Sequence, residues 1–239
     1  MQTDGLSALE TRVAKELEYT DYPNSRWVPK REDDKDPSGR LLDVLIVGAG
    51  QAGQTIALQL RQEGVDNFRI IDQATAGLEG PWLTYARMLT LRSPKEVTGP
   101  DLGLPSLTFQ AWFEAQHGEA AWRELGKVPI ADWAAYLSWM RDVLKIPVEN
   151  NVALLKIEAD GEFPVASLRH MDGRLEQLRC RKLILAHGIE GSGHWWTPPQ
   201  VEAIDKSLWA HTSEQINFDA LVGKRVAVLG VGASAMDNA

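Results

Sequence analysis

Two glycine-rich segments of this chain have the residue spacing that holds a nucleotide diphosphate. The first is Gly48-Ala49-Gly50-Gln51-Ala52-Gly53, and the second is Gly230-Val231-Gly232-Ala233-Ser234-Ala235. In such a loop the first glycine permits a tight turn, the second lets the backbone approach a pyrophosphate, and the third lets a helix pack closely on a strand. The helix N-terminus then offers N–H groups and a partial positive charge to the phosphates. Two such loops suggest that electrons pass from one nucleotide to another.

The elements around the first loop are those that a nucleotide site requires. The apolar run at 41–47 predicts a buried parallel strand. Residues 54–63 predict a helix, and residues 68–72 predict the next strand. Asp72 ends that strand, where a carboxylate can accept hydrogen bonds from the ribose hydroxyls of an adenosine. This context favours dinucleotide binding over the alternative, a glycine turn that only joins a strand to a helix.

The second loop differs from the first at its last position, where Ala235 replaces a third glycine. This change is a weak indication of a nicotinamide cofactor that carries the extra phosphate. Residues 225–229 predict the strand before the loop. The residues that would contact the 2′-hydroxyl or 2′-phosphate of the adenosine ribose come about twenty places later, so the sequence does not distinguish NADH from NADPH. The chain stops at Ala239, so we expect an incomplete second domain with an unpaired sheet edge, or merely a strand and a turn.

The remaining segments predict helices and a long irregular stretch. Ser7-Ala8-Leu9-Glu10 has the form of a capping box and predicts the start of a short amphipathic helix. Residues 73–107 contain four prolines and no clear period, so we expect an irregular segment that lines a site. Helices are expected at 108–117, where Gly118 would stop the first, and at 131–144.

Residues 152–186 change to the pattern of strands. Asp160-Gly161 and Asp172-Gly173 are two-residue hairpin signals between β-rich runs. We expect a three-stranded meander that leads into the apolar strand at 183–185. Cys180, the sole cysteine of the chain, lies in this stretch and is interpreted as a small core residue.

Composition and charge argue against several classes of partner. The formal net charge is −8 and no run of Lys or Arg stands out, which argues against nucleic acid and anionic membranes. The first 18 residues carry acids and no apolar core, so they do not form a signal peptide. No apolar run is long enough to span a bilayer, so we expect a cytoplasmic protein. The five histidines lack metal-ligand spacing, and no metal site is expected.

Four further segments match known motifs: Gly80-Pro81-Trp82, Ser93-Pro94-Lys95-Glu96, Leu185-Ala186-His187-Gly188 and His211-Thr212. Together with the two glycine loops they resemble class B flavoprotein monooxygenases, the group of flavin-containing monooxygenases, Baeyer–Villiger monooxygenases and amino-acid N-hydroxylases. In that family they correspond, in this order, to a Gly-x-Trp element against the flavin, a Ser-x-Lys-Glu segment, a hinge strand and the residues before the NADPH strand. The resemblance covers residues 41–239.

Three departures from the family pattern leave the subfamily open. Arg92 stands where flavin-containing monooxygenases carry an asparagine near the flavin, so their substrate chemistry does not transfer. His187 replaces the hinge threonine. The segment 205–211 lacks the aromatic residue and the glycine of the family signature that ends in a histidine.

The resemblance implies an α/β fold. We expect an FAD-binding Rossmann-like domain, with a βαβ parallel sheet and a three-stranded β-meander, followed by the start of a truncated NAD(P)-binding Rossmann domain. The expected divisions are an N-terminal helix and extended strap at 1–40, the FAD-binding domain at 41–188 and the incomplete NAD(P)H-binding domain at 189–239. The chain would then be the N-terminal portion of a longer enzyme or a truncated product, poorly soluble or weak in flavin retention when isolated.

The implied activity is that of an FAD-dependent, NAD(P)H-dependent monooxygenase. Such an enzyme inserts one oxygen atom from O₂ into a small-molecule substrate via a flavin (hydro)peroxide. The protein would position the flavin, exclude water and set the local charge. The alternatives are an FAD/NAD(P)H-dependent reductase or dehydrogenase of the same fold, and a non-catalytic FAD-binding fragment. The sequence identifies neither the substrate nor the oligomeric state.

The resemblance also assigns site residues. Trp82 could wall the flavin or be an ordinary core aromatic. Arg92 could stabilise a reduced flavin or the peroxide, or be a solvated or phosphate-contacting arginine. Lys95 is interpreted as half of a structural ion pair, and Asp101 as a site residue or a turn residue. The residues expected to contact FAD or the nicotinamide nucleotide are Gly48, Gly50, Gln51, Ala52, Gly53, Asp72, Gln73, Gly80, Trp82, Gly230, Gly232, Ser234 and Ala235.

Overall fold

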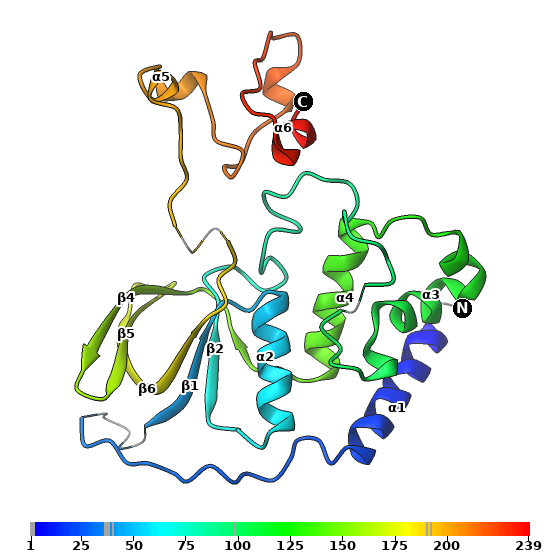
Figure 1. Cartoon of the computed structure of the whole chain (residues 1–239), viewed down its shortest axis with the longest axis vertical. Helices are drawn as coiled ribbons and strands as arrows, with labels where there is room; N and C mark the ends of the chain where they lie inside the picture. The colour runs from blue at the N-terminus through cyan, green and yellow to red at the C-terminus, as the bar shows by residue number, and fades with distance from the viewer. Residues whose placement is uncertain (1–2, 36–38, 40, 98, 190, 192) are drawn as a thin grey trace.

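A six-stranded sheet in the order β3-β2-β1-β6-β5-β4 forms the centre of the protein (Figure 1). The computed structural model describes residues 3–35, 39, 41–97, 99–189, 191 and 193–239. The strands are β1 (Leu42–Val47), β2 (Phe68–Ile71), β3 (Val148–Glu149), β4 (Val152–Asp160), β5 (Phe163–His170) and β6 (Leu175–Leu185).

Strands β3, β2, β1 and β6 run parallel. Strand β1 is buried at every position, as expected for a strand covered on both faces. Val47 at its end pairs with Ile71 of β2 on one side and with Leu185 of β6 on the other. The carboxyl ends of three strands therefore lie at one edge of the sheet, and the first glycine loop follows β1 there. The predicted α/β fold with a βαβ unit is confirmed.

Strands β4, β5 and β6 form the predicted antiparallel meander. The strand predicted at 183–185 is the last part of β6, which runs without interruption from Leu175 to Leu185. Its first half pairs with β5 as far as Arg179, and its pairing with β1 begins at Cys180. The alternation of side chains continues through this junction, so nothing ends the strand. The two-residue strand β3 is too short to leave a sequence pattern.

Four helices lie on one side of the sheet: α1 (Thr3–Tyr19), α2 (Gln51–Gln62), α3 (Phe109–Glu124) and α4 (Ile130–Val143) (Figure 1). Helix α1 begins at Thr3, so Ser7 lies inside it and the predicted cap is wrong. Leu9 and Val13 of α1 are almost completely buried, as expected for the apolar face of the predicted amphipathic helix. Gly118, with a φ of 82°, interrupts α3 as predicted, but the helix resumes and ends at Glu124.

Apolar side chains form one cluster on each face of the sheet. On the helical face the ring of Phe109 lies 5.6 Å from that of Trp133 and 5.5 Å from that of Tyr136. On the opposite face the meander buries Leu168 and Cys180. Cys180 has no exposed surface, and burial raises the pKa of its thiol to about 11. Its position agrees with the predicted core role.

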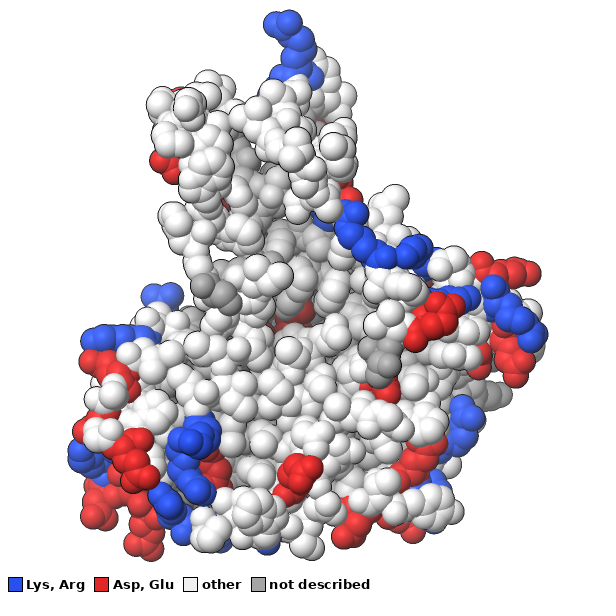
Figure 2. Space-filling view, viewed as in Figure 1, with Lys and Arg blue, Asp and Glu red and all other residues white. Residues whose placement is uncertain are grey.

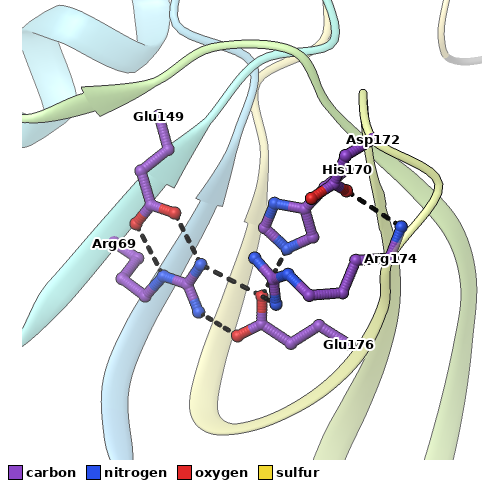
Figure 3. Close-up of polar contacts among 6 residues, drawn as sticks. All are labelled: Arg69, Glu149, His170, Asp172, Arg174 and Glu176. Carbon is purple, nitrogen blue, oxygen red and sulfur yellow. Dashed lines mark hydrogen bonds and ion pairs between the residues drawn. The ribbon is translucent and has the colours of Figure 1, made fainter.

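A charged cluster ties the meander to the parallel strands (Figure 3). Arg69 of β2 donates to a carboxylate oxygen of Glu149 at 2.6 Å and to one of Glu176 at 2.6 Å. His170 of β5 lies 2.7 Å from the same Glu176 carboxylate. Burial alone would raise the pKa of Glu176, but the hydrogen bonds from Arg69 and His170 hold it below its ordinary value. Because four strands contribute, the cluster joins the two halves of the sheet.

The C-terminal part of the chain stands apart from the sheet (Figure 1). It carries two short helices, α5 (Pro199–Glu202) and α6 (Ala233–Asp237). The prediction of a strand at 225–229 is wrong, because these residues are irregular, and Val226 and Leu229 are 56% and 70% exposed. A strand needs a neighbour for its N–H and C=O groups. No such neighbour lies beside this segment in the described part of the chain.

Candidate functional site

A cleft of about 1080 Å³ opens at the carboxyl ends of β1, β2 and β6. Figure 2 shows the surface hollowed below the projecting C-terminal part, while charged side chains lie mainly toward the left, lower and right edges of the view. The cleft lies where parallel sheets usually bind ligands. Its lining combines the first glycine loop, the end of β2, the irregular segment, β4 and the residues after β6: Val47, Gly48, Gly50, Gln51, Ala52, Asp72, Gln73, Ala74, Leu78, Gly80, Pro81, Trp82, Thr84, Tyr85, Val152, Leu154, Ile157, Leu185, Ala186, His187, Gly188, Ile189 and Gly191.

The first glycine loop is shaped by close backbone approaches. Gly48 has a φ of 102°, and a Cβ there would stand 2.5 Å from the carbonyl oxygen of Ala186. A Cβ on Gly53 would stand 1.9 Å from the carbonyl oxygen of Gly48. Neither position has room for a side chain, so α2 starts directly against the end of β1 and β6. This is the tight turn and close helix packing that a dinucleotide loop needs.

The N-terminus of α2 faces the cleft. Helix α2 begins at Gln51, and its N-cap residue Gly50 has extended backbone without a side-chain hydrogen bond to the first turn. Gly50, Gln51 and Ala52 all line the cleft. The Cα of Gly80 lies 3.8 Å from the place that a Cβ on Gly50 would take, so two glycines face each other across this end of the cleft. Backbone N–H groups at such a terminus suit an anionic ligand.

Asp72 connects two parts of the cleft. One carboxylate oxygen accepts a hydrogen bond from the amide of Ala49 at 2.8 Å, and the other accepts one from the amide of Ala74 at 2.8 Å. Each oxygen keeps further acceptor capacity, so Asp72 can hold the loop and also receive hydroxyl groups. Gln73 lines the cleft beside it.

Trp82, in the irregular segment, and His187, after β6, both line the cleft. Trp82 is half-buried and packs edge-on against Trp133, with ring centroids 6.4 Å apart. Both its wall role and its core role therefore fit its position. His187 follows β6 and lines the cleft beside Gly48, whose Cβ position lies 2.9 Å from the His187 Cα.

Arg92, the other predicted catalytic residue, lies outside the described cleft lining. Its side chain is 55% exposed and forms an ion pair with Asp237, with Nη2 and Oδ2 2.5 Å apart. Lys127 also donates to the carbonyl oxygen of Arg92 at 2.7 Å. The structure therefore brings Arg92 to the C-terminal part of the chain rather than to Trp82.

Two further predicted residues have structural partners. The ion pair predicted for Lys95 is not found among the described residues: the ammonium donates to the carbonyl oxygen of Trp122 at 2.5 Å and lies 4.6 Å above its ring. Asp101 is buried and accepts a hydrogen bond from the amide of Gly103 at 2.9 Å, which is the geometry of a turn. Burial first, and then the charge of Asp101, raise the pKa of Tyr136.

The second glycine loop does not reach the cleft. Gly230 and Gly232 precede α6, and Ser234 and Ala235 lie within it, but this helix has only five residues. Val231 is 95% exposed. The structure therefore keeps the two predicted loops apart and gives the second no partner strand in the described residues.

Sequence reasoning missed two contributions to the cleft. The carboxylate of Glu79 receives hydrogen bonds from Arg141 and Asn150 at 2.6 Å and from the amide of Gly77 at 2.8 Å, and this holds the turn before Trp82. Arg141 and Asn150 lie far from Glu79 in the sequence, so no local pattern indicated these two contacts. The apolar side chains of β4 that line the cleft are Val152, Leu154 and Ile157, whose spacing changes where the register of β4 shifts between Leu154 and Lys156, so simple alternation does not predict them.

No helix in the described residues is long and apolar enough to cross a membrane. Likewise, the described ranges contain no group of three or more His, Cys, Asp or Glu residues placed to hold a metal ion.

Comparison with curated proteins identifies a relative of about twice this length. The chain is 46% identical over 235 residues to the FAD-dependent urate hydroxylase of Xanthomonas campestris pv. campestris. The match covers 98% of this chain and 49% of the hydroxylase, so the chain spans about half the length of that relative. The predicted resemblance to the N-terminal portion of a flavoprotein monooxygenase is confirmed by this coverage.

Solved structures share the fold. The cadaverine monooxygenase of the desferrioxamine biosynthetic pathway from Erwinia amylovora, bound to FAD, matches with a TM-score of 0.64 at 18% identity, over 83% of this chain and 47% of that one. A double mutant of flavin monooxygenase from Stenotrophomonas maltophilia matches with a TM-score of 0.57 at 23% identity, over 81% and 51%. Residues 45–239 also match one family along most of the chain. The protein therefore belongs to the pyridine nucleotide-disulphide oxidoreductase family.

Proposed function

We propose that this chain binds FAD and is the flavin-binding part of a hydroxylase that takes electrons from NADH or NADPH. The observation that carries the proposal is the cleft at Gly48–Gly53, where an uncapped helix N-terminus and the carboxylate of Asp72 face one space. A diphosphate suits the helix N-terminus, and a ribose suits the carboxylate. The cytoplasmic location expected from the sequence is part of this proposal.

The residues present fit FAD. The cleft volume of about 1080 Å³ is at the upper end of ligand pockets, as a dinucleotide requires. Gly50 and Gly80 leave the approach to the amides of α2 free of side chains. The diphosphate would lie over Gly50–Ala52, the adenosine ribose beside Asp72 and Gln73, and the flavin ring toward Trp82.

The bound flavin would accept electrons from the nicotinamide and transfer one oxygen atom from O₂ to the substrate. The chain's own residues would orient it and exclude water from it. Trp82 would form one wall of the flavin site. Arg92 would act on the flavin only after its ion pair with Asp237 opens, so its proposed charge-stabilising role depends on that movement. Gly230, Gly232, Ser234 and Ala235 would bind the nicotinamide nucleotide.

For the whole protein we propose hydroxylation of a small molecule. Urate is the first substrate to test, because the relative that is 46% identical is a urate hydroxylase. Nicotinamide-dependent O₂ uptake that increases with urate and yields a hydroxylated product would support this. Hydrogen peroxide as the sole oxygen product would favour the reductase or dehydrogenase alternative.

FAD binding can be tested on the chain itself. We expect the purified protein to bind added FAD in an equilibrium titration followed by flavin fluorescence, which also detects the weak retention expected from the sequence. The variant Gly50→Val should keep its thermal melt and lose the flavin, because its side chain enters the space facing Gly80. Gly126→Val adds a side chain in open space and is the matched control. A parent protein without flavin, or a Gly50→Val variant that binds FAD like the parent, would contradict the proposal.

A non-catalytic FAD-binding fragment is the second candidate. The irregular backbone at 225–229 and the five-residue α6 favour it, because they leave the second nucleotide loop without a strand. Such a fragment would bind FAD, yet NADPH would not bleach the flavin in the absence of oxygen. Rapid bleaching would exclude this candidate.

A further inference from the structure

Arg87 joins the irregular segment that lines the cleft to the C-terminal part of the chain. Its Nη1 donates to the carbonyl oxygen of Tyr85 at 2.7 Å and to that of Thr212 at 2.6 Å. Its Nη2 donates to the carbonyl oxygen of Glu214 at 2.7 Å. The guanidinium carbon also lies 5.4 Å from the centre of the Phe218 ring. One half-buried side chain therefore holds main-chain groups from two segments that lie far apart in sequence.

Residues 211–218, here the clasped segment, already form a compact turn. The amide of Glu214 donates to the carbonyl oxygen of His211 at 2.9 Å, and the amide of His211 donates to the Glu214 carboxylate at 2.9 Å. The His211 ring in turn packs on Trp195, with centroids 5.0 Å apart. Within the His211-Thr212 motif, the carbonyl oxygen of His211 closes this turn, whereas that of Thr212 accepts a hydrogen bond from Arg87. The turn precedes the second glycine loop along the chain.

In the sequence, Arg87 comes shortly after the residues that form one wall of the cleft. The amides of Thr84 and Ala86 both donate to the carbonyl oxygen of Pro81, at 3.2 and 3.0 Å, and close a turn that carries Trp82. Tyr85, whose carbonyl Arg87 binds, also lines the cleft. A ligand that orders this turn therefore also orders the Tyr85 carbonyl group to which Arg87 is hydrogen-bonded.

We propose that Arg87 is a positioning residue that holds the clasped segment, and with it the approach to the second glycine loop, against the wall of the flavin cleft. A guanidinium can satisfy several carbonyl groups at fixed angles, whereas an ammonium is a single point charge. Hydrogen bonds from a charged group are stronger than those between neutral groups. A ligand in the cleft and the order of the clasped segment are therefore coupled, and the coupling is reciprocal.

The test is amide hydrogen exchange of the full chain, with and without FAD, read in peptides that cover the clasped segment. In Arg87→Met we expect exchange in the clasped segment to accelerate by about threefold or more. Local opening of this segment costs less free energy in the variant, because it no longer has to break hydrogen bonds to Arg87. FAD should slow exchange in the clasped segment of the parent and not in this variant. Arg87→Lys should lie between the two. A general loss of stability would instead accelerate exchange throughout the sheet.

Arg61→Met is a matched control. Arg61 also donates to two carbonyl oxygens, those of Leu144 and Lys145, and lies 5.9 Å from the Phe68 ring, but it does so within the main body. Its loss should leave the clasped segment unchanged. Should Arg87→Met not fold, Arg87→Lys and Phe218→Ala decide the question, since Phe218 is 44% exposed and outside the core. Exchange equal to the parent in these variants overturns the inference. This inference extends the proposed FAD site, but the comparison without FAD decides it even if FAD does not bind.

Discussion

The carboxylate of Asp72, at the end of β2, accepts a hydrogen bond from the amide of Ala49 at 2.8 Å, inside the glycine loop that follows β1. The same side chain accepts a second bond from the amide of Ala74 at 2.8 Å. The acid expected to bind a ribose therefore also shapes the loop expected to bind the diphosphate. Its two roles can be separated by substitution.

Replacing Asp72 with alanine removes both backbone hydrogen bonds. We expect FAD affinity to fall roughly ten- to a hundredfold, because a hydrogen bond to a charged group contributes about 1.5–3 kcal/mol. Fluorescence titration with FAD measures this. Asp72→Asn keeps one acceptor and should lose less. Asp66→Ala removes a 63% exposed carboxylate elsewhere and should bind like the parent; an Asp72→Ala variant that does the same would refute the prediction.

Gly53→Ala tests the close packing of α2. The new Cβ would stand 1.9 Å from the Gly48 carbonyl oxygen, which is backbone and cannot move aside alone. We expect the free energy of unfolding to fall by about 3 kcal/mol or more, measured by chemical denaturation. Gly126→Ala adds a methyl group in open space and should stay within about 0.5 kcal/mol of the parent. Equal stability of both variants would show that the loop adjusts.

Glu176→Gln tests the charged cluster by its pH dependence. The folded protein holds the pKa of Glu176 below the ordinary 4.5, so the cluster's stabilisation is present above that pH and is lost as pH falls through the folded value. We expect the parent to lose stability on acidification below about pH 4.5 more steeply than the variant. At pH 7 the variant should be the less stable protein. Glu162 is a control because its side chain is 76% exposed, and the stability of Glu162→Gln should depend on pH as that of the parent does. The same pH dependence in Glu176→Gln would show that the cluster contributes nothing to stability.

Cys180 should be unreactive in the folded protein. Its thiol has no exposed surface, and burial raises its pKa to about 11, so little thiolate exists at pH 8. We expect a thiol reagent at pH 8 to label the protein only in denaturant, with one equivalent incorporated as followed by mass spectrometry. Labelling of the native protein within minutes would mean that the meander opens readily.

The main body could be predicted from sequence where one local pattern determined the result. The apolar run of β1, its glycine loop and the hairpins at Asp160 and Asp172 each depend on nearby residues. The segment 225–229 has the same apolar character as β1 and is nevertheless irregular, because a strand also depends on a partner. The cap predicted at Ser7 failed for a related reason: Leu6, which precedes it, packs against the core, so the helix begins upstream of the local signal.

Only part of the candidate site could be predicted in this way. The backbone positions of the loop and Asp72 follow from a motif with fixed spacing. The contacts of Arg87, Glu79 and Arg92 join residues more than sixty positions apart and leave no local pattern. The role expected for Arg92 depends on resemblance alone, and its partner Asp237 lies in a part of the chain whose arrangement no motif specifies.

The uninterrupted course of β6 limits how this protein can vary. Residues can be added at the hairpin tips near Gly161 or Gly173 without disturbing the strands beside them. One residue inserted next to Cys180 would instead rotate the rest of β6 by half a period and turn its inward side chains outward. It would also displace His187 from the rim of the cleft. The hairpin tips can therefore vary in length, whereas the number of residues in β6, which pairs with both β5 and β1, must stay constant.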